Sequence, residues 1–303
     1  MADHPTKRAG FVAILGPPNA GKSTLLNTLV GAKVSIVSPK VQTTRRRIIG
    51  ITIHQSSQII FIDTPGIFAP KRQLDRAMVQ AAWSVAGDAD LVLIVADASR
   101  LRQGDLEAVI RGVVDARTSC YLVLNKTDLV PKPKLLPLID SLQKKMEFKE
   151  ILLVSALHKE GCDELLTKVA EDLPEGPWLY PEDELSDLSQ RALAAEITRE
   201  KIFQNLHQEL PYNITVETES WVEGASGEEV RIDQTIYVMR DNQKAIVLGH
   251  RGQMIKAIGA AARTELEALL DVRVHLFLFV KIRPNWMDDP ERYAEMGLDF
   301  PGR

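Results

Sequence analysis

Residues 11–23 read FVAILGPPNAGKS, and they indicate the class of fold that the first half of the chain adopts. A continuous apolar run ends at Gly16, and the pattern Gly16-x-x-x-x-Gly21-Lys22-Ser23 follows directly before a helical pattern at 22–30. Between a strand and a helix, such a loop curls its N–H groups round a phosphate, and the helix N-terminus adds a positive dipole end. The residues expected to contact nucleotide here are Gly16, Pro17, Pro18, Asn19, Ala20, Gly21, Lys22, Ser23 and Thr24.

Four more apolar runs follow the first one and alternate with helical patterns. The strands are predicted at 11–16, 58–63, 90–97, 120–126 and 150–156, and the helices near 22–30, 72–86, 103–116, 133–146 and 161–172. Strands that alternate with helices and are almost continuous in Ile, Val and Leu indicate a sheet covered on both faces. The first half is therefore predicted to be a doubly wound α/β domain with a mostly parallel sheet.

Composition sets the outer limits of the interpretation. The 303 residues are enough for about two domains, and 45% hydrophobic and 26% charged residues are ordinary for a globular protein. No apolar run is long enough to span a bilayer, and no signal peptide is apparent, so we expect a cytosolic protein. Cys120 and Cys162 lie far apart and are expected to be reduced thiols. With a net charge of −4, binding to nucleic acid would need a local basic patch.

A magnesium site is predicted where the second strand run ends, in the sequence Asp63-Thr64-Pro65-Gly66. An aspartate at the carboxyl end of a strand faces the ligand crevice of an open α/β sheet. Asp63 would hold Mg²⁺ through water together with the Ser23 hydroxyl, while Lys22 reaches the β- and γ-phosphates and the Gly66 N–H contacts the γ-phosphate.

A base-recognition site is predicted at Asn125-Lys126-Thr127-Asp128, which follows another strand. The Asp128 carboxylate can accept hydrogen bonds from N1–H and the 2-amino group of guanine, both of which adenine lacks, so it would reject ATP. The Lys126 stem would lie along the base, and Asn125 would tie this loop to the phosphate loop. Ser155-Ala156-Leu157 ends the next strand, and the Ala156 N–H could bind guanine O6.

The second half of the chain has a different pattern. A proline- and carboxylate-rich linker at 172–187 precedes a helix from about 187 to 209, strands at 213–223 and 229–240, two helices within 242–270, and a strand at 272–283. This order predicts an α+β domain, and 284–303 are expected to form an irregular tail.

A Gly-x-x-Gly turn, Gly249-His250-Arg251-Gly252, separates the two helices of 242–270. Such a turn lets a nucleic-acid backbone approach closely, although a simple helix–turn–helix linker would explain it equally well. Between 240 and 263 five basic residues stand against the single carboxylate of Asp241, which is the local patch that the net charge hides. The residues expected to contact RNA are Ile246, Gly249, His250, Arg251, Gly252, Ile255 and Lys256.

The nucleotide motifs resemble those of small GTPases related to translation factors. By this resemblance Thr44, or as second choice Thr43, would bind Mg²⁺ in the GTP state, and Thr44, Lys22 and Asn19 would serve catalysis. Arg45 to Arg47 are either a solvated charge run or contacts to RNA or phosphate. Ile67 occupies the position of the water-orienting glutamine of Ras-like enzymes, so slow hydrolysis is expected. Asn19 matches the asparagine that helps hold K⁺ in potassium-activated members; it could equally be a side chain that stabilises the loop.

The pattern I-V-L-G-x-x-G-x-x-I-K-x-I-G at 246–259 and the order of elements around it resemble a type II KH domain. A GTPase domain followed by such a domain resembles the Era family of bacterial GTPases. The resemblance also covers PGIFAPKRQLDRAM (65–78), LPEGPWLYPEDELSD (173–187) and ITREKIFQNLHQELPY (197–212). It implies a GTPase domain at 8–177, a linker at 178–190, a KH domain at 191–285 and a tail at 286–303.

The family further implies the ligands and partners. These are GTP or GDP with Mg²⁺ and K⁺, the 3′ end of 16S rRNA, and a role as a monomer in assembly of the 30S subunit. Peripheral membrane association is also implied, although no amphipathic or polybasic anchor demands it. An alternative is a nucleotide-gated RNA-binding switch in which hydrolysis is incidental.

Overall fold

The chain forms two compact units in the computed structural model, which describes residues 6–100, 103–116, 119–206 and 210–300. Within the described residues, the first unit comprises 6–35, 44–187 and 293–300, and the second comprises 36–43 and 188–292. The segment 36–43 thus belongs to the second unit, although it lies between two elements of the first in the sequence.

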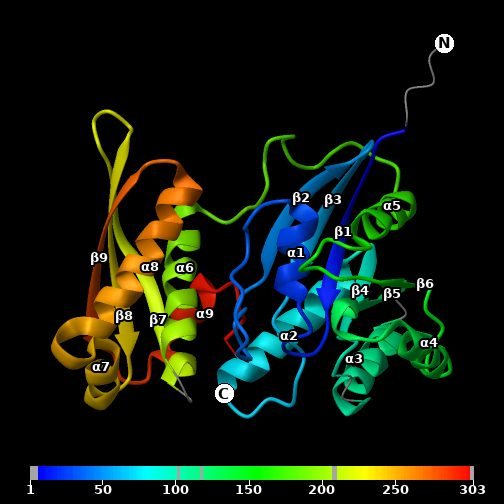
Figure 1. Cartoon of the computed structure of the whole chain (residues 1–303), viewed down its shortest axis with the longest axis horizontal. Helices are drawn as coiled ribbons and strands as arrows, with labels where there is room; N and C mark the ends of the chain where they lie inside the picture. The colour runs from blue at the N-terminus through cyan, green and yellow to red at the C-terminus, as the bar shows by residue number, and fades with distance from the viewer. Residues whose placement is uncertain (1–5, 101–102, 117–118, 207–209, 301–303) are drawn as a thin grey trace. The chain divides into compact units, whose positions relative to one another are not determined.

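The first unit is built on a six-stranded sheet with the order β2-β3-β1-β4-β5-β6 (Figure 1). All pairs are parallel except β2–β3, which is antiparallel. The strand order reverses at β1, between β3 and β4, which is the place where open α/β sheets bind ligands. The elements are β1 (Arg8–Leu15), α1 (Lys22–Val30), β2 (Ile48–His54), β3 (Ser57–Asp63), α2 (Gln73–Asp88), β4 (Leu91–Asp97), α3 (Gln103–Ala116), β5 (Cys120–Asn125), α4 (Leu135–Gln143), β6 (Glu150–Leu153) and α5 (Cys162–Asp172).

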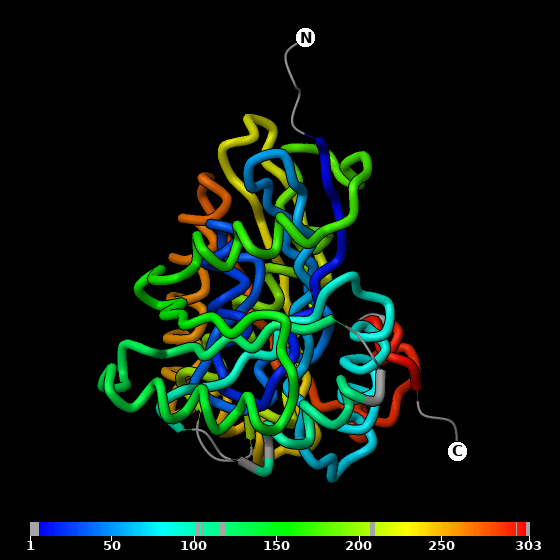
Figure 2. Tube along the Cα trace, turned by 90° about the vertical axis from the view of Figure 1, so that its right-hand side faces the viewer, coloured from blue at the N-terminus to red at the C-terminus, as the bar shows by residue number. Residues whose placement is uncertain are grey.

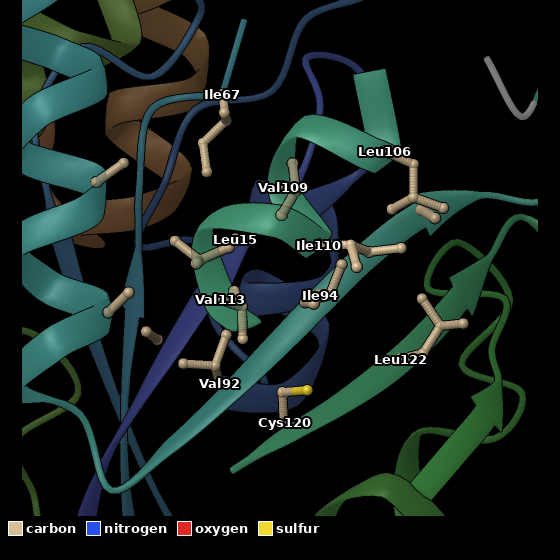
Figure 3. Packing of buried hydrophobic residues seen from close by; sticks show 14 of the residues in the cluster. Leu15, Ile67, Val92, Ile94, Leu106, Val109, Ile110, Val113, Cys120 and Leu122 are labelled. Carbon is tan, nitrogen blue, oxygen red and sulfur yellow. The ribbon is translucent and has the colours of Figure 1, made fainter. Parts of the chain in front are cut away.

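The core of this unit explains why the predicted strands are so apolar. Residues of β1, β4 and β5 pack beneath the apolar face of α3, with Leu15, Ile94 and Leu122 facing Val109 and Ile110 (Figure 3). Each such side chain, fully removed from water, contributes about 1.5–3 kcal/mol relative to exposure. Helices α1 and α5 contact the strands β2 and β3 and each other. In Figure 2 the side of the first unit with α4, β6 and α5, drawn in green, faces the viewer.

Strand β2 is missing from the sequence-based prediction. Its residues IIGITIH contain Gly50, which weakens strand propensity. Glycine is needed there because a Cβ would lie 2.6 Å from Leu26 Cδ1 of α1. Part of the predicted linker covers the outer edge of this strand. The Ile51 N–H donates to the Leu185 carbonyl at 2.9 Å, and the Ser186 hydroxyl donates to the Ile49 carbonyl at 2.6 Å.

The second unit confirms the predicted order of helix, strand, strand, helix, loop, helix and strand. Strand β8 pairs antiparallel with β7 and parallel with β9, and α6 and α8 pack against each other and against the sheet (Figure 1). The elements are α6 (Gln190–Asn205), β7 (Thr215–Glu223), β8 (Glu229–Val238), α7 (Asp241–Leu248), α8 (Gln253–Leu270) and β9 (Arg273–Ile282).

Two boundaries differ from expectation. The helix predicted to run to about 209 ends at Asn205, and 207–209 lie outside the described residues. The tail is not fully irregular, because it forms a 3-10 turn at Trp286–Asp288 and the short helix α9 (Pro290–Glu295). The buried Trp286 indole N–H donates to the Asn213 carbonyl at 3.1 Å, which fixes the start of the tail to the second unit.

None of the helices in the described part of the chain is long and apolar enough to cross a bilayer.

Candidate functional site

The phosphate loop has the backbone that its glycines predict. Gly16 has φ +151°, and a Cβ there would lie 2.2 Å from the Val95 carbonyl oxygen. Gly21 has φ +90°, and a Cβ would meet the Asn125 amide nitrogen at 2.4 Å. Asn19 also has a positive φ, at 62°, and is exposed to solvent. The loop therefore winds tightly between β1 and the N-terminus of α1, as a phosphate cradle requires.

Lys22 is folded into this loop. Its ammonium group donates to the carbonyls of Gly16 at 3.2 Å and Pro17 at 3.0 Å. Burial lowers the pKa of Lys22 to about 8, and the nearby Asp63 carboxylate opposes that shift. A buried ammonium that donates to carbonyls gains from a phosphate anion, because an opposite charge compensates its lost hydration.

The three predicted metal ligands come together. The Ser23 hydroxyl donates to Asp63 Oδ2 at 2.6 Å and lies 2.9 Å from the Thr44 hydroxyl. Asp63 Oδ1 is buried and has no hydrogen-bond partner among the described residues, and burial raises the pKa of this carboxyl. Two hydroxyls and a carboxylate with an unsatisfied oxygen fit Mg²⁺, which prefers oxygen ligands and retains several waters.

The structure distinguishes the two candidate threonines. The Thr43 hydroxyl donates to the Lys40 carbonyl at 2.7 Å and lies 2.8 Å from the Ser38 hydroxyl, whereas Thr44 faces Ser23. This geometry favours Thr44 as the ligand. The neighbouring Arg45 is only 4% exposed, so a solvated charge run does not describe it, while Arg47 is exposed.

The segment after Asp63 joins the site to the core. The Thr64 hydroxyl donates to the Ile14 carbonyl at 2.8 Å, and a Cβ on Gly66 would lie 2.9 Å from the Pro18 nitrogen. The Ile67 N–H donates to the Gly16 carbonyl at 3.0 Å. The Ile67 side chain is 4% exposed and belongs to the core cluster (Figure 3). Its side chain therefore serves packing and cannot orient a water molecule.

Asn125 connects the three loops of the predicted base site. Its amide N–H₂ donates to the Ala20 carbonyl at 3.0 Å, and its oxygen accepts the N–H groups of Lys126 at 2.8 Å and Ala156 at 3.0 Å. The Ala156 N–H that we predicted for guanine O6 is thus donated to Asn125 in this structure. The prediction that Asn125 ties this loop to the phosphate loop has direct geometric support.

Asp128 is oriented by its neighbours. Its Oδ1 accepts the Ser155 hydroxyl at 2.6 Å, and Thr127–Leu129 form a 3-10 turn that presents the carboxylate. Lys126 has φ +63°, and its ammonium donates to the Asn19 carbonyl and to Asp97 Oδ2, both at 2.7 Å. Leu157 is 74% exposed beside this loop.

Two residues of the site escaped the sequence-based reasoning. The Asp97 carboxylate pairs with the Lys126 ammonium. Burial alone would raise the pKa of Asp97, but the hydrogen bond from Lys126 opposes it and the pKa is lowered. Ser35 donates to Asp63 Oδ2 at 3.2 Å. Asp97 could have been predicted as a site residue, because it lies at the carboxyl end of a strand next to the point where the strand order of the sheet reverses. Nothing in the sequence marks Ser35.

In the second unit, the Gly-x-x-Gly turn has the left-handed backbone that its glycines allow. Gly249 has φ +69° and Gly252 φ +76°, and Arg251 also adopts the left-handed region, at φ 50°. A Cβ on Gly249 would lie 2.6 Å from Met254 Cβ, so the turn requires glycine directly after α7. Helix α8 begins directly after Gly252 and directs its N-terminus toward the turn.

The side chains around this turn are mostly open to solvent. His250, Arg251 and Lys256 are exposed, and Ile246 is 52% exposed. Ile255 is half-buried and packs against the core of the unit, so it offers less surface to a base than predicted. The remaining basic residues of the predicted patch are Arg240, Lys244 and Arg263, of which Arg240 and Arg263 are exposed and Lys244 is half-buried.

Comparison with known proteins agrees with both halves of this description. The family of 50S ribosome-binding GTPases matches residues 11–126, and the KH domain family matches residues 209–287. GTPase Era of Mesorhizobium japonicum is 58% identical over 300 residues, which cover 99% of this chain and 96% of that protein. The Agrobacterium fabrum GTPase Era is also 58% identical and covers 97% of this chain and 92% of that protein. The chain belongs to the Era family of GTPases.

Solved structures of Era have the same architecture. A variant of Aquifex aeolicus Era bound to GDP·AlF4− superposes with a TM-score of 0.90 at 42% identity, covering 96% of this chain and 99% of that one. Era in complex with MgGDPNP and nucleotides 1506–1542 of 16S ribosomal RNA gives a TM-score of 0.91 at the same identity and coverage. The chain is thus an Era-family GTPase that binds GTP and GDP and carries a KH domain.

Proposed function

We propose that this GTPase is a ribosome assembly factor that binds the 3′ end of 16S rRNA through its KH domain and supports maturation of the 30S subunit. The observation that carries the proposal is the match along 96% of this chain to a solved Era that holds both MgGDPNP and 16S rRNA. The exposed basic residues around Gly249–Gly252 supply the charge that a phosphate backbone needs.

In the nucleotide site we propose Mg²⁺ on Ser23, Thr44 and, through water, Asp63. The ion would neutralise charge on the β- and γ-phosphates during hydrolysis. Lys22 binds the same phosphates, Gly66 contacts the γ-phosphate, and Asp128 reads guanine. Asn19 is proposed to help hold K⁺. Turnover that is equal in K⁺ and Na⁺ would remove this last assignment.

In the RNA site the Gly249–Gly252 turn is proposed to take a few single-stranded nucleotides. Arg251 and Lys256 would contact phosphate, and Ile246 offers an exposed apolar surface to a base. The protein is proposed to act as a monomer in the cytoplasm. Peripheral membrane association rests on the family resemblance alone.

The RNA proposal is tested by fluorescence anisotropy with a labelled oligonucleotide of the 16S rRNA 3′ end and a scrambled control. Arg251→Glu with Lys256→Glu should weaken binding at least tenfold, because each reversal replaces an attraction to phosphate by a repulsion. Arg111→Glu, an exposed charge reversal in the first unit, should leave affinity unchanged. Equal affinity of the wild type for both RNAs would contradict recognition of the 3′ end.

A second function is favoured by the buried side chain of Ile67. Because the Ile67 side chain cannot orient a water molecule, the nucleotide would act mainly as a switch that controls RNA binding. Single-turnover GTP hydrolysis with and without the 3′-end RNA distinguishes the two. Stimulation by RNA supports the enzyme cycle, and its absence supports the gate.

A further inference from the structure

Asp97 is the last residue of β4 and lies next to the loop that is predicted to bind the base. Strand β4 pairs in parallel with β5, and the register of the pair ends with Asp97 opposite Asn125. The Ala98 N–H continues this pairing with a hydrogen bond to the Asn125 carbonyl at 2.9 Å. The register of the sheet therefore places Asp97 beside the start of the Asn125–Asp128 motif, at the carboxyl edge of the sheet where ligands bind.

The two oxygens of the Asp97 carboxylate have different partners. Oδ1 accepts the N–H of Ser99 at 2.9 Å and its hydroxyl at 2.6 Å, so it closes the turn that follows β4. Oδ2 accepts the Lys126 ammonium at 2.7 Å. The Asp97 side chain is 15% exposed and that of Lys126 is 32% exposed, so water only partly screens the pair. Because the turn holds Oδ1, Oδ2 presents its charge to Lys126 in a defined direction.

Lys126 extends from this carboxylate to the phosphate loop. Its ammonium also donates to the Asn19 carbonyl at 2.7 Å. A Cβ added to Gly21 would lie 3.7 Å from Lys126 Cε, so the stem of the side chain passes against the phosphate loop. An exposed lysine has many rotamers, and fixing them on binding costs affinity. With its ammonium held by two acceptors, the Lys126 stem has already lost much of this freedom.

We infer that Asp97 is a positioning residue for nucleotide binding: its carboxylate holds the Lys126 stem in the position that the guanine base needs. The inference rests on the predicted position of that stem along the base. A side chain that is held in its binding position gives up little further freedom when the base packs on it. The effect concerns the base and not the phosphates, so the affinities for GDP and GDPNP should depend on Asp97 equally.

The test is the binding of fluorescent GDP and GDPNP to the full chain with Asp97→Asn or Asp97→Glu. Asparagine can still close the turn through Oδ1, but an amide N–H₂ replaces Oδ2 and cannot accept a hydrogen bond from an ammonium group. Glutamate keeps the charge for Lys126 but is a poorer residue for the turn. Asp97→Asn should weaken both nucleotides about fivefold, the cost of ordering one released lysine, and Asp97→Glu should weaken them less.

The order of the two variants separates positioning of Lys126 from a merely structural role. If Asp97 served only the turn after β4, Asp97→Asn would bind nucleotide like the wild type and Asp97→Glu would bind more weakly, which would overturn the inference. The matched control is Asp172→Asn in the same unit. Asp172 pairs with Lys149 at 2.6 Å, and its side chain is 22% exposed. Asp172→Asn should leave both affinities unchanged, and a loss equal to that of Asp97→Asn would also overturn the inference.

Lys126→Ala separates this inference from the predicted role of Lys126. If Lys126→Ala weakens GDP and the folded Asp97→Asn variant does not, the inference is wrong and the role of Lys126 stands. If Lys126→Ala leaves GDP affinity intact, both are wrong. A protein with both substitutions should bind GDP as tightly as Lys126→Ala alone, because Asp97 acts through Lys126. Losses that add in the double variant would overturn the inference.

Discussion

Asn125→Ala should weaken nucleotide binding, because Asn125 joins three loops of the nucleotide site. The Asn125 side chain is buried and makes three hydrogen bonds, to Ala20 of the phosphate loop, to Lys126, and to Ala156 of the next loop. A hydrogen bond between neutral groups contributes about 1 kcal/mol net, so the three together amount to about 3 kcal/mol. The loss is larger where the abandoned N–H of Ala156 stays buried, because an unpaired donor then keeps its desolvation cost.

This energy should appear in nucleotide binding, because the three loops that Asn125 joins are those predicted to contact phosphate and guanine. About 3 kcal/mol corresponds to roughly a 100-fold change in an equilibrium constant. If half of it appears in binding and half in the stability of the unliganded protein, GDP affinity falls about tenfold. Titration with a fluorescent GDP measures the first part, and hydrogen exchange of the Ala156 and Lys126 amides reports the second.

The control is Asn205→Ala, which removes one hydrogen bond, to the Lys201 carbonyl at 2.8 Å in the second unit. It should leave GDP affinity unchanged. An Asn125→Ala protein that binds GDP within twofold of the wild type, with unchanged amide exchange in these loops, would show that Asn125 does not organise the nucleotide site.

Three further predictions concern single positions. Gly16→Ala should abolish nucleotide binding and destabilise the first unit, because its Cβ would lie 2.2 Å from the Val95 carbonyl; thermal melting with and without GDP checks this, and an unchanged melting temperature would be inconsistent with it. Gly87→Ala should instead stabilise the protein by about 0.5–1 kcal/mol, since it lies in α2 with nothing within 4 Å of the new Cβ; a lower melting temperature would contradict this. Ser23→Ala removes a proposed Mg²⁺ ligand and the donor to Asp63, so the Mg²⁺ concentration needed for tight GDPNP binding should rise at least tenfold; an unchanged Mg²⁺ titration would remove Ser23 from the metal site.

The sequence predicts what local patterns determine. The buried strands and the helix starts follow from apolar periodicity, and the phosphate loop, Asp63 and Asn125 follow from motifs whose spacing fixes them at the carboxyl edge of the sheet. The structure brings together Ser23 and Asp63, which were predicted from their motifs, and Thr44, which was predicted from the family resemblance.

What the sequence does not predict depends on contacts between distant residues. Strand β2 was missed because Gly50 serves close packing against Leu26, a contact that no local pattern reveals. The position of Ile255 against the core, the burial of Arg45 and the hydrogen bond from Ser35 to Asp63 are likewise tertiary. The attachment of 36–43 to α6 joins residues more than 150 positions apart, through side chains that look like an ordinary charged helix face.

We propose that one chain combines a GTP site with a binding site for the 3′ end of 16S rRNA. Crosslinking of the full-length protein to ribosomal RNA, with GDPNP and with GDP, measures both properties in one experiment. We expect enrichment of the 16S 3′ end that is stronger with GDPNP and that is lost in the Arg251→Glu, Lys256→Glu variant. No enrichment of the 3′ end with either nucleotide would contradict it, while the assignment as a GTPase would stand.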